Sequence, residues 1–184
     1  MLRDGALGIY PTDSCYALGC ALGDSQSAMK ITRIRKTEKR HNFTLLCRDL
    51  SEIAIYAQIE NWSYRLLKAH TPGPYTFVLK ATRDVPRRLQ NPKKKTIGIR
   101  VPDHAVSQAL LSELGEPIMT STLLLPDADL PLNDPEDIFS RMSGDVDFVI
   151  TSGSCGVEPT TVVDLTGDYP IVLRSGKGSI EAFQ

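Results

Sequence analysis

The sequence lacks the residue groups that identify the common catalytic and metal-binding classes. It has four cysteines without a C-x-x-C spacing, and its histidines, His41, His70 and His104, share no metal-ligand spacing. It also has no P-loop, no G-x-G-x-x-G after a strand, no H-E-x-x-H and no G-x-S-x-G. We therefore expect no structural metal and no disulfide, and the P-loop, Rossmann, zincin and α/β-hydrolase classes are excluded.

Long apolar runs are missing as well. The longest uncharged apolar run falls far short of the ~18 residues that a membrane span needs, and Met1 to Gly5 lead directly into a strand-like segment rather than a signal peptide. The 184 residues are 41% hydrophobic, which is enough for one globular domain over residues 1–184. We expect a cytoplasmic protein that does not bind a membrane.

Acidic residues are scarce in the first half of the chain, and basic residues are scarce in the second. Residues 1–100 hold 18 Lys or Arg against 8 Asp or Glu, whereas residues 101–184 hold 3 against 14. If the fold gathers the basic residues of the first half on one face, that face suits polyphosphate or nucleic acid. The alternative is that these charges are scattered over the surface and screened by salt.

Strand-like and helical patterns alternate along the chain. Strands are predicted at 7–10, 15–20, 43–47, 75–81, 96–101, 117–122, 148–151, 160–165 and 171–174. Capped helices are predicted to begin at Asp24, Ser51, Asn61, Asp103 and Asp134. Because hairpin-like turns join some strands and helices join others, we expect an α/β fold with an open, twisted, mixed β-sheet flanked by helices.

The stretch YPTDSCYALGC, from Tyr10 to Cys20, is the most informative local pattern. Pro11 fixes φ and removes a backbone donor, so the chain turns there and presents Thr12 and Asp13 at the end of a strand. In α/β sheets, ligands bind at strand ends. The alternative is a plain hairpin corner in which Asp13 caps its own turn.

Hydroxyl and guanidinium groups recur at other predicted strand ends. The residues concerned are Thr76, Arg100, Thr120, Ser121, Thr122, Thr160, Thr161 and Arg174. Such side chains bind the oxygens of phosphate and carboxylate groups. The pattern predicts a polar site for an anionic ligand.

Six motifs resemble the signatures of the YrdC-like superfamily: YPTDSCYALGC, TPGPYTFVLK, IGIRVP, GEPIMTSTLLL, PTTVVDL and IVLRSGKG, in this order. HNFTLLCRDLSE together with TPGPYTFVLK is similar to the YciO branch. The resemblance implies the α/β twist fold, whose sheet curves around a positively charged concave surface. Better-known members make threonylcarbamoyl-adenylate from threonine, bicarbonate and ATP for the threonylcarbamoyl-adenosine of tRNA, and others are described as binding double-stranded RNA.

The resemblance also implies roles for individual residues. The implied catalytic set is Thr12, Arg35, Lys36, Arg100, Ser121 and Thr122, in which Thr12 and Arg100 hold threonine. The residues implied to bind nucleotide or substrate are Asp13, Thr76, Thr120, Thr161 and Arg174. ATP would enter with Mg²⁺ bridging its triphosphate. RNA, either double-stranded RNA or tRNA, is expected on the cations Lys30, Arg33, Lys39, Arg40, Lys93, Lys94 and Lys95.

The sequence departs from the synthase pattern at two positions and at its start. Thr37 stands where synthases carry an arginine, and Leu124 stands where they carry an asparagine. Threonine lacks the guanidinium fork that binds a phosphate, and leucine lacks a polar amide. Neighbouring cations such as Lys36 and Arg40 are candidates to replace the missing charge. Family members usually carry a longer segment before the first strand, so we expect a truncated or misassigned N-terminus.

Two functions of different classes therefore stand side by side. The first, which the two departures favour, is a binding module whose basic concavity holds nucleotide or RNA without efficient turnover. The second is a threonylcarbamoyl-adenylate synthase with an altered site, because the other motif residues are in place. Pyrophosphate release that depends on both threonine and bicarbonate distinguishes the two hypotheses.

Overall fold

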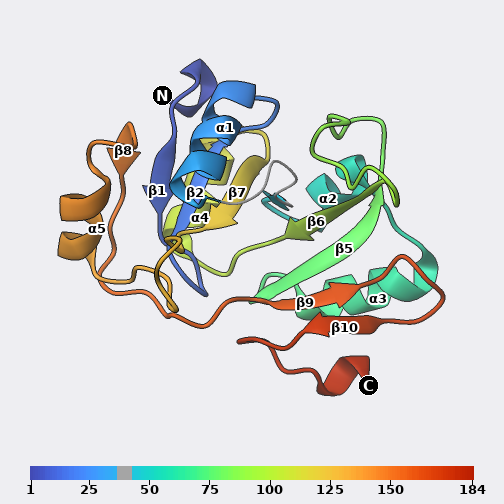
Figure 1. Cartoon of the computed structure of the whole chain (residues 1–184). Coiled ribbons are helices and arrows are strands. Elements are labelled where there is room, and N and C mark those ends of the chain that lie inside the picture. The colour runs from blue at the N-terminus through green and yellow to red at the C-terminus, as the bar shows by residue number, and fades with distance from the viewer. Residues whose placement is uncertain (37–42) are drawn as a thin grey trace.

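Ten β-strands form one sheet in the part of the chain that this computed structural model describes, residues 1–36 and 43–184. They are β1 (Gly8–Tyr10), β2 (Ala17–Ala21), β3 (Thr44–Leu46), β4 (Ala57–Gln58), β5 (Tyr75–Ala81), β6 (Thr96–Arg100), β7 (Ile118–Thr122), β8 (Phe148–Val149), β9 (Thr161–Asp164) and β10 (Ile171–Arg174). The strand order is β10-β9-β5-β6-β3-β7-β2-β1-β8, and β4 pairs with β5 outside this path (Figure 1).

The sheet is mixed, open and twisted, as the sequence predicts. Among the described strands, the pairs β1–β8, β3–β6 and β5–β9 are parallel, and neighbours such as β1–β2, β2–β7 and β5–β6 are antiparallel. Nine of the ten strands overlap a predicted strand, and the two-residue β4 is missed because it is too short to show alternation. The predicted fold class is therefore confirmed.

Five α-helices accompany the sheet in the same described ranges. They are α1 (Ser25–Ile34), α2 (Leu50–Tyr56), α3 (Asn61–His70), α4 (Ala105–Leu114) and α5 (Pro135–Met142), and short 3₁₀ turns lie at Leu2–Asp4 and Glu181–Phe183. Asp24 and Asp134 accept amide hydrogens of the first turns of α1 and α5, so these predicted helix starts are confirmed. None of the described helices is long and apolar enough to cross a membrane.

The starts of the other three helices differ from the prediction by one or two residues. The observed caps are Asp49 for α2, Glu60 for α3 and His104 for α4, in place of the predicted starts Ser51, Asn61 and Asp103. At α4 the shift has a local cause, because the neighbouring side chain offers an acceptor: His104 Nδ1 accepts the amide of Val106 at 3.2 Å.

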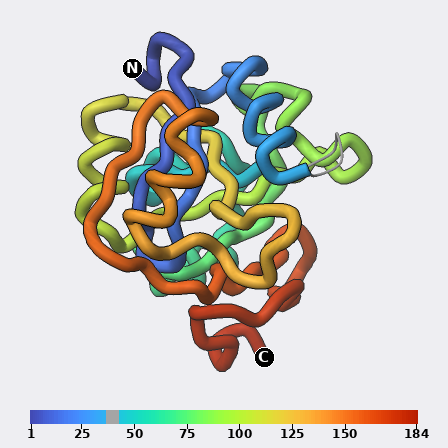
Figure 2. Tube along the Cα trace, turned by 60° about the vertical axis from the view of Figure 1, so that its left-hand side comes forward, coloured from blue at the N-terminus to red at the C-terminus, as the bar shows by residue number. Residues whose placement is uncertain are grey.

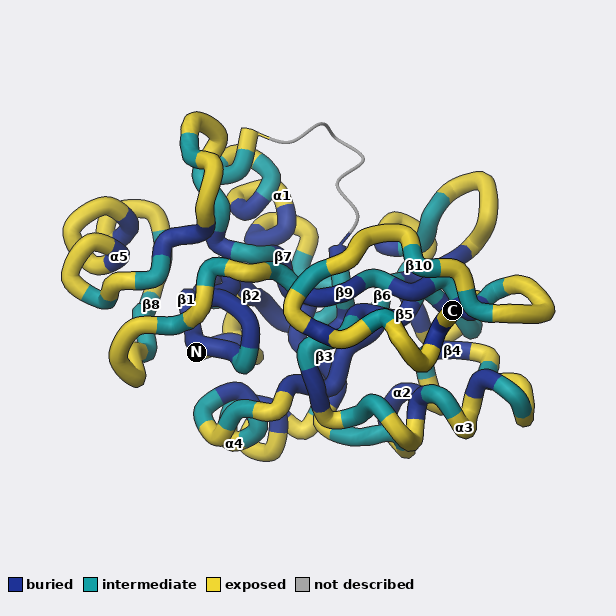
Figure 3. Tube along the Cα trace, turned by 90° about the horizontal axis from the view of Figure 1, so that it is seen from below, coloured by how far each residue is buried: buried dark blue, intermediate teal, exposed yellow. Residues whose placement is uncertain are grey.

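Helices cover the two faces of the sheet unequally. Helices α2, α3 and α4 lie along one face, and α1 lies on the other (Figure 3). The fully buried side chains of Phe77 and Leu79 on β5 belong to the same core cluster as Ile53 of α2 and Leu67 of α3. Figure 2 shows the two termini at opposite ends of the molecule. The sheet face opposite α2 and α3 is where the candidate site lies.

Candidate functional site

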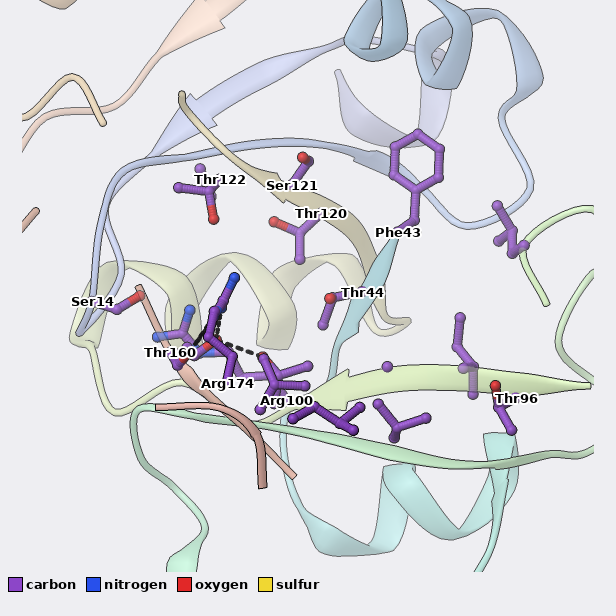
Figure 4. A pocket seen from close by; sticks show the side chains of 18 of the residues that line it. Ser14, Phe43, Thr44, Thr96, Arg100, Thr120, Ser121, Thr122, Thr160 and Arg174 are labelled. Atoms are coloured by element: carbon purple, nitrogen blue, oxygen red, sulfur yellow. Dashed lines mark hydrogen bonds between the residues drawn. The ribbon is translucent and has the colours of Figure 1, made fainter. Parts of the chain in front are cut away.

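A polar hollow of about 440 Å³ lies over β3, β5, β6, β7 and β9 (Figure 4). Strand alternation forms its floor, because Thr76 and Val78 face the hollow while Phe77 is buried in the core. Gly98 keeps the floor open, since a Cβ there would come within 3.3 Å of Thr44 Oγ1. We call this site the main hollow, and its polar lining includes Ser14, Arg35, Thr44, Thr76, Lys94, Thr96, Arg100, Thr120, Ser121, Thr122, Thr160, Asp164 and Arg174.

Arg100 reaches the main hollow from the end of β6 and forms a buried ion pair with Asp13. The Arg100 Nη2 contacts Asp13 Oδ1, and the two side chains are only 8% and 12% exposed. Asp13 Oδ2 and Arg100 Nε are both buried and have no hydrogen-bond partner among the described residues. Arg100 therefore lines the main hollow with its guanidinium, while its Nε is a buried donor that no described residue pairs.

Arg174 reaches the main hollow from the edge strand β10. Its Nε and Nη2 donate to the carbonyl oxygen of Thr160 at 3.2 and 2.8 Å (Figure 4). The Thr160 hydroxyl lies 2.8 Å from that of Thr76. Burial lowers the pKa of the Arg174 guanidinium, which is nevertheless charged at neutral pH. A fixed cation next to two linked hydroxyls favours a phosphate or carboxylate group.

Arg35 brings a third guanidinium to the main hollow from the end of α1. Its Nη1 donates to Ser121 Oγ at 2.6 Å, and its Nε donates to the carbonyl oxygen of Leu124 at 3.3 Å. Burial lowers the pKa of Arg35. On the same strand as Ser121, the Thr120 hydroxyl accepts a hydrogen bond of 2.8 Å from the buried Tyr10. The main hollow thus joins three guanidinium groups to a row of hydroxyls.

Two of the predicted site hydroxyls serve the backbone instead of the main hollow. Thr12 Oγ1 donates to the Cys15 carbonyl at 2.6 Å and accepts from the amides of Ser14 and Cys15, so it caps the Pro-Thr-Asp turn. The alternative reading of this turn assigned that cap to Asp13, which instead pairs with Arg100. Thr161 is fully buried, and its Oγ1 holds the C-terminal segment through the Gly178 carbonyl at 2.6 Å.

The predicted RNA-binding cations that the structure describes lie on several different parts of the molecular surface. Lys94 lines the main hollow, whereas Arg33 lines a second hollow with Arg141 and Asp145, and Lys30 lies 4.0 Å from Asp147. Lys93 and Lys95 are exposed on the turn before β6. Lys36 is exposed and does not line the main hollow, and Lys39 and Arg40 lie outside the described residues. The described members of this set are therefore not gathered into one pocket.

The structure adds residues that the sequence did not single out. Cys15 lines the main hollow, and burial raises the pKa of its thiol while Arg100 acts in the opposite direction. Thr44 lines the floor from β3, and Lys177 Nζ donates to the Asp13 carbonyl. Cys15 lies inside the YPTDSCYALGC motif and could have been found there, but Lys177 meets Asp13 only through the fold.

The fold and this lining define an α/β protein with a candidate site for an anionic ligand. The sequence model of the Sua5/YciO/YrdC family, described as telomere recombination, matches residues 1–176, and the chain belongs to this family. It is 49% identical over 183 residues to the uncharacterized YciO of Escherichia coli, covering 100% of this chain and 89% of that protein. The crystal structure of E. coli YciO matches with a TM-score of 0.95 over 100% of this chain and 89% of that one.

More distant relatives include proteins named as synthases. The chain is 28% identical over 122 residues to the threonylcarbamoyl-AMP synthase of Neisseria gonorrhoeae, which is 66% of this chain and 65% of that protein. The structure of P. abyssi Sua5 complexed with L-threonine matches with a TM-score of 0.89 at 24% identity, over 98% of this chain and 53% of that one. The latter similarity concerns the fold alone.

Proposed function

We propose that this chain is a YciO-type binding protein that holds a nucleotide in the main hollow and RNA on its exposed cations, with weak or absent synthase activity. The observation that carries the nucleotide part is the set of three guanidinium groups, Arg35, Arg100 and Arg174, which line one hollow of nucleotide size. Thr76, Ser121 and Thr160 add hydroxyl donors beside these cations. A triphosphate supplies the oxygens that such a lining binds.

Mg²⁺ would enter this site on the triphosphate. Among the described residues, no group of three or more His, Cys, Asp or Glu side chains could hold a metal ion. Asp164 is the single carboxylate in the described lining, and its Oδ1 already accepts from the Thr166 hydroxyl at 2.6 Å. This fits a magnesium ion bound mainly by phosphate and water, which is its usual coordination in nucleotide sites.

Weak turnover follows from the two departures from the synthase pattern. Thr37 lies outside the described residues, and Leu124 contributes its carbonyl oxygen to Arg35 but no side chain to the main hollow. A synthase relies on cations and polar groups placed for the transition state, so the loss of one cation and one amide lowers the rate more than the affinity.

A second candidate function is threonylcarbamoyl-adenylate synthesis. The Arg100 guanidinium favours it, because a cation at the wall of the main hollow suits the carboxylate of an amino acid. In that reaction the threonine amine takes up carbon dioxide as a carbamate, whose oxygen attacks the α-phosphate of ATP while pyrophosphate leaves. The relative named above as a threonylcarbamoyl-AMP synthase supports this candidate.

Calorimetric titration of ATP with Mg²⁺ tests the nucleotide part of the proposal. We expect Arg174→Gln to weaken ATP binding about tenfold, because one charge-assisted contact to phosphate is worth roughly 1.4 kcal/mol. The matched control is Arg65→Gln, which removes an exposed cation from α3 and leaves ATP affinity unchanged. Absence of ATP binding by the wild type, or equal affinities of the two variants, contradicts the proposal.

A further inference from the structure

Another hollow, of about 700 Å³ and lined by basic side chains, lies beside β4 and the loop that joins β5 to β6. This loop is the green segment at the upper right of Figure 1. The lining includes Gln58, Arg83, Arg87, Gln90, Asn91 and Lys95. We call it the edge hollow, because the neighbouring strand β4 pairs with β5 outside the main strand order of the sheet.

The charge of the edge hollow has one sign. Arg83, Arg87 and Lys95 are exposed, and no Asp or Glu belongs to its described lining. None of these three cations forms an ion pair with another described residue. Three unpaired cations around one depression repel each other, and an anionic ligand removes this repulsion.

Hydrogen bonds give the loop around the edge hollow a defined shape. Gln90 Nε2 donates to the Val85 carbonyl at 2.8 Å, and Asn91 Oδ1 accepts the amides of Lys93 and Lys94 at 3.0 Å. The Lys95 amide donates to the Asn91 carbonyl at 2.8 Å. The cations therefore project from a fixed turn rather than from a free chain.

The turn at 91–95 also connects the edge hollow to the main hollow. Asn91 lines both hollows, whereas Lys94 lines the main hollow and Lys95 the edge hollow. Lys95 has φ +51°, in the left-handed region that a lysine rarely adopts, so consecutive lysines are directed to opposite sides of the turn. A polymeric ligand that extends from the main hollow past Asn91 therefore reaches Lys95 next.

We infer that the edge hollow binds the backbone phosphates of a single-stranded RNA segment whose neighbouring nucleotide occupies the main hollow. This inference rests on the proposed function, because it assigns the main hollow to a nucleotide. The main hollow, at about 440 Å³, admits one nucleotide and not a duplex, so RNA enters it unpaired.

The lining of the edge hollow fits a polynucleotide backbone better than a free nucleotide. No aromatic side chain belongs to its described lining, so it offers no aromatic ring on which a base can stack. Its cations are exposed and carried on long side chains, which suits phosphate contacts without sequence readout. A mononucleotide site is instead enclosed and contacts the base.

The test measures binding of a fluorescent oligouridine strand of about ten nucleotides, a length within the range of single-strand sites. We expect the double variant Arg83→Gln with Arg87→Gln to weaken this binding about tenfold at low salt and to reduce the salt slope by about 1.4, or 0.7 for each lost phosphate contact. Its affinity for ATP stays that of the wild type. The matched control, Arg65→Gln with Lys68→Gln, removes two exposed cations from α3 and leaves RNA binding unchanged.

Each outcome of this experiment separates the inference from the proposed function. If the wild type binds the oligouridine and both double variants bind it equally, the edge hollow is not the site and the inference fails alone. If only duplex RNA binds, the single-strand inference fails while RNA binding stands. If the Arg83 and Arg87 changes weaken ATP binding to the same extent as RNA binding, the edge hollow binds the nucleotide and the inference is overturned.

Discussion

Asp13 and Arg100 place opposite charges side by side at the wall of the main hollow, from segments 87 residues apart. Both side chains are almost fully buried, and each keeps one polar atom without a described partner. An isolated charge in such a place is costly, so the two groups depend on one another. The pair thus fixes the direction of Arg100 toward the main hollow.

We expect Asp13→Asn to lower the free energy of unfolding by about 3 kcal/mol, because it leaves the Arg100 guanidinium buried without its counter-charge. Urea denaturation measures this loss. The double change Asp13→Asn with Arg100→Gln should recover part of it, since neither charge then remains. If the losses of stability caused by Asp13→Asn alone and Arg100→Gln alone simply add up in the double variant, the two residues do not interact.

Individual residues show how far the sequence predicts the site. Arg35, Thr76, Arg100, Thr120, Ser121, Thr122 and Arg174 were named from the sequence and all line the main hollow. Thr12 was named as well, but its hydroxyl is used by its own turn. A position at a strand end predicts that a side chain lies near a site. It does not predict the hydrogen-bond partner of that side chain, which depends on the local turn geometry.

The helices depend on caps whose position the sequence predicts only approximately. Several polar residues stand near each helix start, and any of them can accept the first free amides. In α2 the cap is Asp49, whose Oδ1 accepts the Glu52 amide at 2.9 Å. The predicted cap of α4, Asp103, is exposed, and His104 takes its place. The long, periodic elements are therefore predicted well and their ends less so.

We expect Asp49→Ala to lower the free energy of unfolding by about 1 kcal/mol at neutral pH. The hydrogen bond from the Glu52 amide, with Arg48 nearby, holds the pKa of Asp49 below its ordinary value of 3.8, although burial opposes this. A lowered pKa in the folded state means that the stabilisation is present above pH 3.8 and is lost as the pH falls below it.

Denaturation curves of wild type and Asp49→Ala between acid and neutral pH test this. The difference in the free energy of unfolding between the two proteins should become smaller as the pH drops below 3.8, the ordinary pKa of the carboxyl. Asp103→Ala is the control, because Asp103 is exposed and does not cap α4, and it should leave stability unchanged. A difference that is independent of pH would show that the Asp49 carboxylate is not responsible.

For the whole molecule, the charge asymmetry of the sequence becomes two adjoining basic hollows. The first half of the chain supplies Arg35 and Arg100 to the main hollow and Arg83, Arg87 and Lys95 to the edge hollow. The sequence predicts the excess of cations but not this division, because Lys94 and Lys95 separate through the conformation of one turn. Long-range placement of this kind depends on the complete fold.

We expect the main hollow to bind a nucleotide but to turn it over poorly. The most direct test is pyrophosphate release from ATP that depends on both threonine and bicarbonate. We compare the wild type with the double variant Thr37→Arg and Leu124→Asn, which restores the two polar groups of the synthase pattern. We expect slow or absent release by the wild type and a gain of about tenfold or more in the variant, which corresponds to about 1.4 kcal/mol or more. Fast release by the wild type that the double change does not improve would contradict it, and neighbouring cations such as Lys36 and Arg40 would then supply the missing charge.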